Sequence, residues 1–146
     1  MREACVLDAS VVARWWFTEA DFVLAKPART FLHAYVHGEL EIHAPDLIHA
    51  EVANVLWKIV RFRQWPAVAA RDAVSHLLEL NLSIHSMSGI LENALDLSLD
   101  YDITVYDAAY VSLARKLGVP VYTADKKLVK KLSANMPHVM ALEPVR

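Results

Sequence analysis

The sequence predicts an α/β fold in which a central, mainly parallel sheet of four or five short strands lies between two layers of helices. Short apolar runs alternate along the chain with longer segments whose apolar residues recur at helical spacing. Strands that alternate with helices in this way form parallel sheets covered on both faces. A hydrophobic fraction of 55% with only 3 glycines indicates a large core and few loops. Because the 146 residues contain no repeat or linker, we expect one domain spanning residues 1–146.

The first strand is expected at residues 4–7, a short apolar run of the kind that forms buried parallel strands, and it ends at Asp8. A turn and a helix over residues 11–17 should follow. Residues 22–36 then carry apolar side chains at helical spacing. Gly38 is suited to end that helix, because glycine is the usual residue just beyond a helix C-terminus.

A second strand is expected at residues 40–44. Pro45 and Asp46 then open a long helix, since proline is favoured in the first helical turn. The apolar stripe of this helix covers residues 48–60, and Pro66 ends it by breaking the helical hydrogen-bond pattern.

The remaining elements alternate in the same way. Further helices are expected at residues 66–80, 88–99, 106–117 and 126–132, and further strands at residues 82–85, 119–123 and 139–142. Gly118 separates the helix at 106–117 from the strand that follows it, as a C-terminal cap does. The elements therefore give one three-layer α/β/α domain.

Composition and charge narrow the classes of protein that the chain can represent. Cys5 is the only cysteine, so an internal disulfide or a cysteine-based zinc site is excluded, and a reducing compartment is expected. No segment approaches the roughly 18 apolar residues needed to span a bilayer, and Asp8 interrupts the apolar N-terminal stretch as no secretory signal would. We therefore expect a cytoplasmic protein without a membrane partner. The net charge of -2 offers no overall attraction to nucleic acid, although residues 58–71 and 115–131 are locally basic.

Four acidic residues lie in settings where carboxylates are unusual: Asp8, Glu51, Asp107 and Asp125. Each of the three aspartates is placed where it can cap a helix, which is a purely structural role. Glu51 has no such role, because it lies at the margin of the apolar stripe of its helix. No cation stands three or four residues away to pair with it, and burying an unpaired carboxylate is costly.

Topology favours a joint role for these acids. In open parallel sheets, sites form outside the carboxyl ends of the strands, and Asp8 and Asp125 directly follow two expected strands. Four carboxylates brought close together could not all stay ionised without a cation. Oxygen ligands without a Cys or His pattern favour magnesium or manganese over zinc. Divalent-metal phosphodiester chemistry is the leading interpretation, and an interaction domain whose acids only cap helices stays open.

The contexts of the four acids resemble a known family. They are VLDAS around Asp8, PDLIHAEVANVL around Glu51, TVYDAAYVSLARKLG around Asp107 and YTADKKL around Asp125. In this order they resemble a PIN domain, and within that family the VapC-type toxin of prokaryotic type II toxin–antitoxin pairs. The resemblance covers nearly the whole chain, and the last two segments are its most specific part.

The resemblance implies a PIN-like fold and an endoribonuclease that depends on Mg²⁺ or Mn²⁺. Asp8, Asp107 and Asp125 would hold the metal or metals, and Glu51 would bind directly or through water. The supporting polar residues would be Ser10, Asn54 and Thr123. Water would be the nucleophile, leaving 5′-phosphate and 3′-hydroxyl ends. The implied partners are an RNA substrate, a second copy in a homodimer and a cognate antitoxin protein.

Two further interpretations concern the lysines beside Asp125 and a rival class of protein, the receiver-like signalling domain. Lys126 and Lys127 lie beside Asp125 and could bind RNA phosphates, although a solvated helix face explains them equally well. A magnesium-binding receiver-like signalling domain also combines a parallel sheet with an aspartate cluster, and Lys126 fits its pattern. Such a domain would have an adjacent acidic pair after the first strand, which Asp8 lacks.

Overall fold

A parallel sheet of five strands runs through the protein in the computed structural model, which describes residues 2–144. Residues 1, 145 and 146 of the expected domain lie outside the described residues. The strands are β1 (Glu3–Leu7), β2 (Leu40–Pro45), β3 (Ser83–His85), β4 (Val121–Thr123) and β5 (Val139–Ala141). Their order across the sheet is β3-β2-β1-β4-β5, and every neighbouring pair is parallel. The predicted sheet is confirmed.

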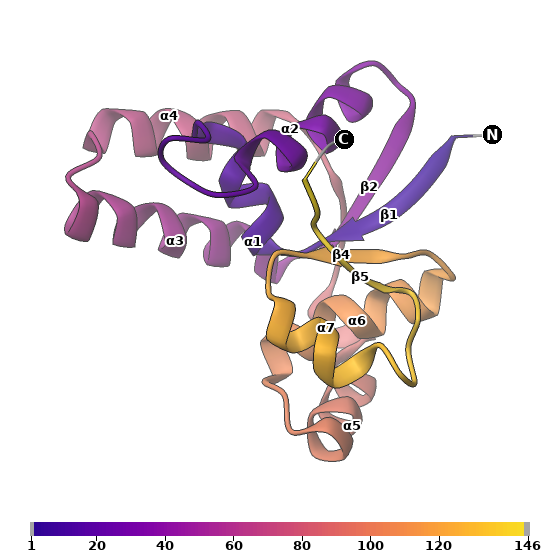
Figure 1. The fold of residues 1–146 in the computed structure, drawn as a ribbon. Coiled ribbons are helices and arrows are strands. Elements are labelled where there is room, and N and C mark those ends of the chain that lie inside the picture. Colours follow the sequence, from indigo (N-terminus) through magenta and orange to yellow (C-terminus); the bar gives the residue numbers. More distant parts are fainter. Residues whose placement is uncertain (1, 145–146) are drawn as a thin grey trace.

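Helices lie on both sides of this sheet (Figure 1). They are α1 (Ala9–Val12), α2 (Ala25–Val36), α3 (Leu47–Arg63), α4 (Ala67–Glu79), α5 (Leu91–Tyr101), α6 (Val105–Leu117) and α7 (Lys126–Leu132). In the view of Figure 1, α5, α6 and α7 lie below the sheet, whereas α3 and α4 run side by side and project to the left. The three-layer α/β/α prediction is therefore confirmed.

Some helix boundaries differ from the prediction, each for a local reason. The helix expected at residues 11–17 is the short α1 followed by a 3₁₀ turn, η1 (Ala13–Trp16), because Asp8 already caps the chain at Ala9. The helix expected from residue 22 begins only at Ala25. Leu24 before it has a left-handed backbone with φ of 69°, which an α-helix cannot include.

The start of α5 also lies later in the chain than predicted. The expected helix at residues 88–99 is preceded by a second 3₁₀ turn, η2 (Met87–Gly89), and the α-helix proper covers Leu91–Tyr101. Ser86 caps η2 by accepting a hydrogen bond from the Ser88 backbone amide, so the chain turns before it enters α5.

The core surrounds β1 and α6. Val6 and Leu7 of β1 have no exposed surface, and residues 108–114 of α6 are all buried. A strand in the middle of a parallel sheet is covered on both faces, which explains the uninterrupted apolar run at the end of β1. Because β1 and α6 are held on all sides, the acids at their ends, Asp8 and Asp107, have a rigid support.

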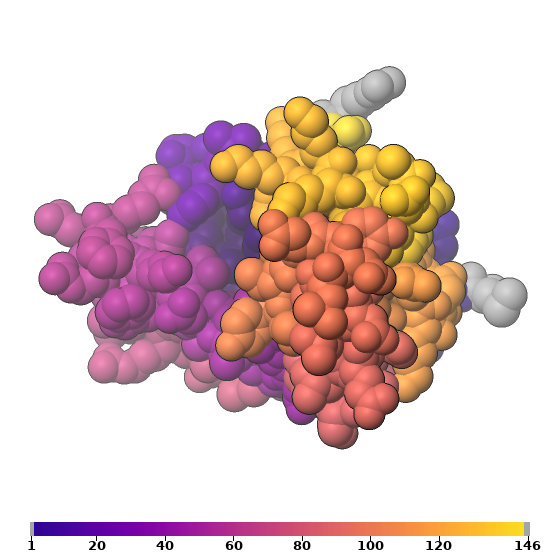
Figure 2. All heavy atoms as spheres, turned by 90° about the horizontal axis from the view of Figure 1, so that it is seen from below, coloured from indigo at the N-terminus to yellow at the C-terminus, as the bar shows by residue number. Residues whose placement is uncertain are grey.

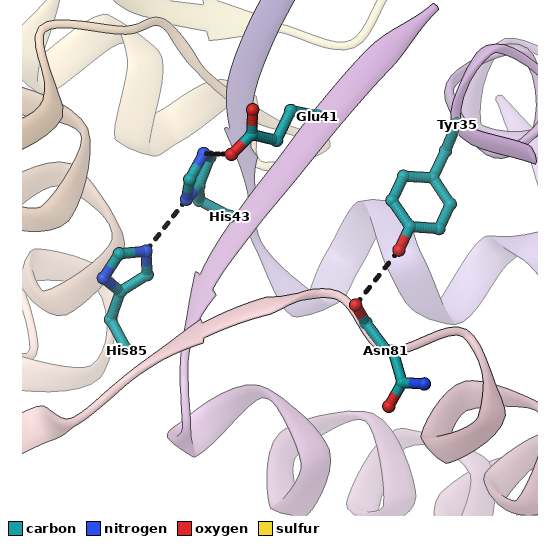
Figure 3. Close-up of polar contacts among 5 residues, drawn as sticks. All are labelled: Tyr35, Glu41, His43, Asn81 and His85. Atoms are coloured by element: carbon teal, nitrogen blue, oxygen red, sulfur yellow. Dashed lines mark hydrogen bonds and ion pairs between the residues drawn. The ribbon is translucent and has the colours of Figure 1, made fainter. Parts of the chain in front are cut away.

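Polar side chains tie the edge strand β3 to its neighbours (Figure 3). His43 Nδ1 of β2 lies 2.8 Å from His85 Nε2 of β3, and His43 Nε2 lies 2.9 Å from Glu41 Oε1. The Tyr35 hydroxyl of α2 donates to the carbonyl oxygens just before β3, at 2.6 Å for Leu80. The edge strand is thus fixed through side chains as well as through its backbone.

Along residues 2–144, no helix has both the length and the apolar character that crossing a bilayer requires.

Candidate active site

Asp8 stands at the carboxyl end of β1 and caps α1. Its Oδ1 accepts hydrogen bonds from the backbone amides of Ser10 at 3.0 Å and Val11 at 3.3 Å, and from the Ser10 hydroxyl. The side chain is only 7% exposed. Burial raises the pKa of Asp8 to about 6, and the charge of Asp107 adds to the rise, while the bonds from Ser10, Thr123 and Val11 oppose it.

Ser10 and Thr123 connect the end of β1 to the end of β4. Leu7 pairs with Tyr122 in the parallel register, so the residues that follow both strands emerge at the same edge. The Ser10 hydroxyl accepts a hydrogen bond from the Ala124 amide at 2.9 Å, and the Thr123 hydroxyl accepts one from the Asp125 amide at 3.0 Å. Ser10 therefore joins the loop that carries Asp8 to the loop that carries Asp125, and Thr123 holds the second loop in place.

Asp107 and Asp125 each occupy the start of a helix. Thr104 caps α6 by accepting a hydrogen bond from the Asp107 amide at 3.1 Å, which leaves the Asp107 carboxylate free. Burial raises the pKa of Asp107, and the nearby charge of Asp125 raises it further. Asp125 caps α7 by accepting from the amides of Lys127 at 3.0 Å and Leu128 at 3.2 Å. Capping and site placement are compatible, because both occur where a helix begins.

Glu51 on α3 is held by a residue that the sequence analysis missed. The hydroxyl of Tyr110 donates a hydrogen bond to Glu51 Oε1 at 2.6 Å, and Tyr110 itself is only 3% exposed. Burial raises the pKa of Glu51, the bond from Tyr110 lowers it, and the charge of Asp107 raises it. The available signal was spacing: Tyr110 follows Asp107 by three residues and so lies on the same helical face.

All four acids line one cleft, with a volume of about 730 Å³. One wall is α3, which contributes Glu51 and Asn54, and the other is α6, which contributes Asp107. Asp8 and Ser10 form the base. Figure 2 shows the surface hollowed between the magenta atoms of α3 and the orange atoms of the C-terminal half, with indigo N-terminal atoms deeper inside.

The predicted phosphate-binding lysines are placed differently from the acids. Lys126 and Lys127 are exposed on α7 and do not line the cleft. Among the cleft-lining residues of the described chain, the cation is Lys58 of α3, accompanied by Tyr106 on the opposite wall. Lys58 belongs to the basic segment at residues 58–71, which was not predicted to lie beside the acids. Its signal was again spacing, because it follows Glu51 by seven residues, two helical turns.

The donor chemistry of the cleft fits a hard divalent cation. Its acids offer only oxygen, the ligand that Mg²⁺ and Mn²⁺ prefer. Within residues 2–144, the ion pair found within 4.0 Å is His43 with Glu41, so no Lys or Arg neutralises the four acids at that distance. In the same part of the chain, no three His, Cys, Asp or Glu side chains converge closely enough to ligate one ion as they stand. The acids share the cleft without forming a closed ligand shell.

This fold and this cleft define a class of protein: an α/β domain with an all-parallel sheet and an acidic cleft at the carboxyl ends of its central strands. A family model described as PIN domain matches residues 5–132, which is most of the chain. The protein belongs to the PIN-domain family.

Curated relatives place it near one group within that family. The chain is 36% identical over 135 residues to Ribonuclease VapC3 of Pyrobaculum aerophilum, covering 88% of this chain and 95% of the relative. It is 33% identical over 129 residues to Ribonuclease VapC1 of Mycobacterium tuberculosis, covering 86% of this chain and 89% of the relative. The predicted resemblance to VapC ribonucleases is confirmed.

Solved structures share the fold. The crystal structure of PAE2754 from Pyrobaculum aerophilum superposes with a TM-score of 0.70 at 20% identity, over 96% of this chain and 84% of that chain. VapBC2 from Rickettsia felis, solved bound to a DNA fragment from its promoter, superposes with a TM-score of 0.60 at 12% identity, over 94% of this chain and 96% of that chain.

Proposed function

We propose that the protein is an endoribonuclease that hydrolyses RNA phosphodiester bonds with Mg²⁺ or Mn²⁺, and that it is the toxin of a type II toxin–antitoxin pair. One observation carries the proposal. Asp8, Glu51, Asp107 and Asp125 line a single cleft in a chain that is 36% identical to a ribonuclease over almost its whole length. The comparisons favour this activity over the receiver-like alternative, because the curated relatives are ribonucleases.

The residues of the cleft divide the work. Asp8, Asp107 and Asp125 would hold the metal, with Glu51 binding it directly or through water. A divalent ion in such a site supplies a water of lowered pKa and stabilises charge on the phosphate and the leaving oxygen. Ser10 donates to Asp8 and accepts from the Ala124 amide, Thr123 accepts from the Asp125 amide, and Tyr110 donates to Glu51, so these side chains orient the acids. Asn54 offers an amide to the substrate from the wall of α3.

The proposal extends to partners and location. We infer that residues 1–146 form one domain that acts in the cytoplasm as a homodimer and is neutralised by a cognate antitoxin protein. The antitoxin is supported by the relatedness to Ribonuclease VapC3, and the fold is shared with VapBC2, which was solved bound to a DNA fragment from its promoter. The reducing location is supported by Cys5, which is buried and has no disulfide partner.

Cleavage of labelled RNA tests the activity. The purified protein is incubated with the RNA in Mg²⁺, Mn²⁺ or a chelator, alongside an Asp107→Asn variant purified in the same way. We expect cleavage by the parent protein with either metal, none with chelator, and none by the variant. Cleavage by both proteins would reveal a contaminating nuclease, and chelator-resistant cleavage by the parent alone would exclude metal dependence.

A further inference from the structure

Two side chains of the cleft carry polar groups that the described part of the protein does not use. Lys58 is exposed, lines the cleft from α3 and has no acid within 4.0 Å among the described residues. Tyr106 lines the cleft from the first turn of α6 and is 58% exposed, although tyrosine is usually more deeply packed than that. Neither side chain donates or accepts a hydrogen bond within residues 2–144, so both polar groups are open to a ligand in the cleft.

Lys58 continues a row of polar side chains along α3. Glu51, Asn54 and Lys58 recur at intervals of three and four residues, which places them on one face of the helix, and all of them line the cleft. At 1.5 Å per residue, Lys58 is about 10 Å from Glu51 along the helix axis. An RNA strand that runs along α3 could therefore place one backbone phosphate beside the acids and another beside Lys58.

Tyr106 lies on the opposite wall, next to Asp107. A half-exposed phenol ring beside a phosphate-cleaving site is suited to stack on a base, because every base has a flat face and aromatic stacking does not depend on sequence. A base can stack on a protein ring only when it has left its own helix. A ring at this position therefore selects a nucleotide that is unpaired.

We propose that Lys58 and Tyr106 form a nucleotide-binding subsite that holds the RNA across the cleft, with the Lys58 ammonium on a backbone phosphate and the Tyr106 ring on an unpaired base. The proposal rests on the proposed ribonuclease function and assigns the substrate grip to residues outside the acids. It also moves the main phosphate contact from Lys126 and Lys127 on α7 to Lys58 inside the cleft.

Binding without cleavage tests the subsite. All proteins carry Asp107→Asn, and anisotropy is measured with a fluorescein-labelled hairpin RNA that has a single-stranded loop, in chelator, over a series of salt concentrations. The same stem closed as a continuous duplex is the comparison RNA. Lys58→Met keeps the apolar stem of the side chain and removes its charge, and Lys26→Met on α2 is the matched control, exposed and outside the cleft.

We expect Lys58→Met to weaken hairpin binding about three- to tenfold and to lower the salt slope by about 0.7, the value for one phosphate contact on a single strand. Lys26→Met should stay within about twofold. Tyr106→Leu should weaken hairpin binding at least about fivefold and leave duplex binding unchanged, whereas Tyr106→Phe, which keeps the ring, should bind like the parent.

Several results would overturn the subsite. One is that Lys58→Met and Lys26→Met weaken hairpin binding equally, and another is that Tyr106→Phe weakens it as much as Tyr106→Leu does. A third is that Tyr106→Leu weakens duplex binding as much as hairpin binding. The fourth is that the parent protein does not bind the hairpin. The proposed ribonuclease function is tested separately, in the cleavage assay with the protein that retains Asp107. Absence of cleavage there would count against that function and not against the subsite. An active enzyme with unchanged binding by the variants would contradict the subsite alone.

Discussion

The buried carboxylate of Asp8 lowers the free energy of unfolding when it is ionised. Its pKa in the folded protein is about 6 against an ordinary value of 3.8, chiefly because the carboxylate is buried. A carboxyl group whose pKa is raised by folding favours the folded state only while it is protonated. Its contribution is complete below the unfolded pKa and is lost as the pH rises through about 6. At neutral pH the charge of Asp8 therefore opposes folding unless a cation is bound.

The first prediction removes that charge. Without metal and at about pH 7.5, Asp8→Asn should raise the free energy of unfolding by about 1–3 kcal/mol, because asparagine caps the helix equally well and carries no buried charge. At about pH 4 the gain should largely disappear, since the aspartate is then protonated in the folded state. Denaturant unfolding in chelator measures both values. The exposed Asp96→Asn on α5 is the control, and a gain of the same size at both pH values would contradict the explanation.

Tyr110 supports a second prediction at the same scale. Tyr110→Phe keeps the ring in the core and removes the 2.6 Å bond to Glu51. Because that bond orients the carboxylate, the Mn²⁺ concentration that half-saturates both the thermal stabilisation and the cleavage should rise about three- to tenfold. Tyr35→Phe is a matched control, since it loses a 2.6 Å hydroxyl bond to Leu80 and neither residue lines the cleft. The control should lose about 1 kcal/mol of stability and keep its metal requirement. An unchanged requirement in Tyr110→Phe would remove the positioning role.

At the scale of elements, the helix starts that capping residues mark were predicted more accurately than the others. The starts of α6 and α7 were predictable, because Thr104 and Asp125 are capping residues directly before helical spacing. The late start of α2 was not, because apolar periodicity continues through Leu24 while its backbone is left-handed. The preceding turn is closed by Thr18 and Asp21, whose side chains each accept a hydrogen bond from the other's backbone amide, as in a capping box, although α2 begins only at Ala25.

The end of α3 gives a third prediction. Gln64 follows α3 with a left-handed φ of 57° and is exposed, a position that favours glycine. Gln64→Gly should stabilise the protein by about 0.5–1 kcal/mol, which raises the melting temperature by roughly 1–4 °C in a domain of this size. Calorimetry of Gln64→Gly beside Gln64→Ala separates backbone strain from loss of the side chain. If alanine stabilises as much as glycine does, the strain is not the cause.

At the scale of the whole molecule, topology made part of the site predictable. Asp8 and Asp125 follow strands that prove to be neighbours, and any parallel arrangement of β1 beside β4 brings them together. The contact of Glu51 with Tyr110 could not be predicted from the sequence, because it depends on how α3 and α6 are placed relative to each other. The spacing of Lys58 from Glu51 places the two on one helical face, but that Lys58 faces Tyr106 across a cleft depends on how α3 and α6 are placed.

A fourth prediction concerns the linkage between metal and protons in the cleft. Asp8, Glu51 and Asp107 all have raised pKa values, chiefly because they are buried, and a bound cation would have to displace their protons. The rise in melting temperature caused by a fixed Mn²⁺ concentration should therefore be larger at about pH 7.5 than at about pH 5. Asp107→Asn should reduce this difference. A metal effect independent of pH would show that the ion binds elsewhere.

The strand order β3-β2-β1-β4-β5 has a consequence for biosynthesis. Asp8 is synthesised well before its neighbours on β4, because Ser10 and Thr123 lie 113 positions apart in the sequence. Until β4 has been translated and docked beside β1, the nascent chain lacks Asp125 and the brace that steadies Asp8. We therefore expect a chain that terminates before β4 to lack a complete cleft, so the four acids come together only late in the synthesis of this domain.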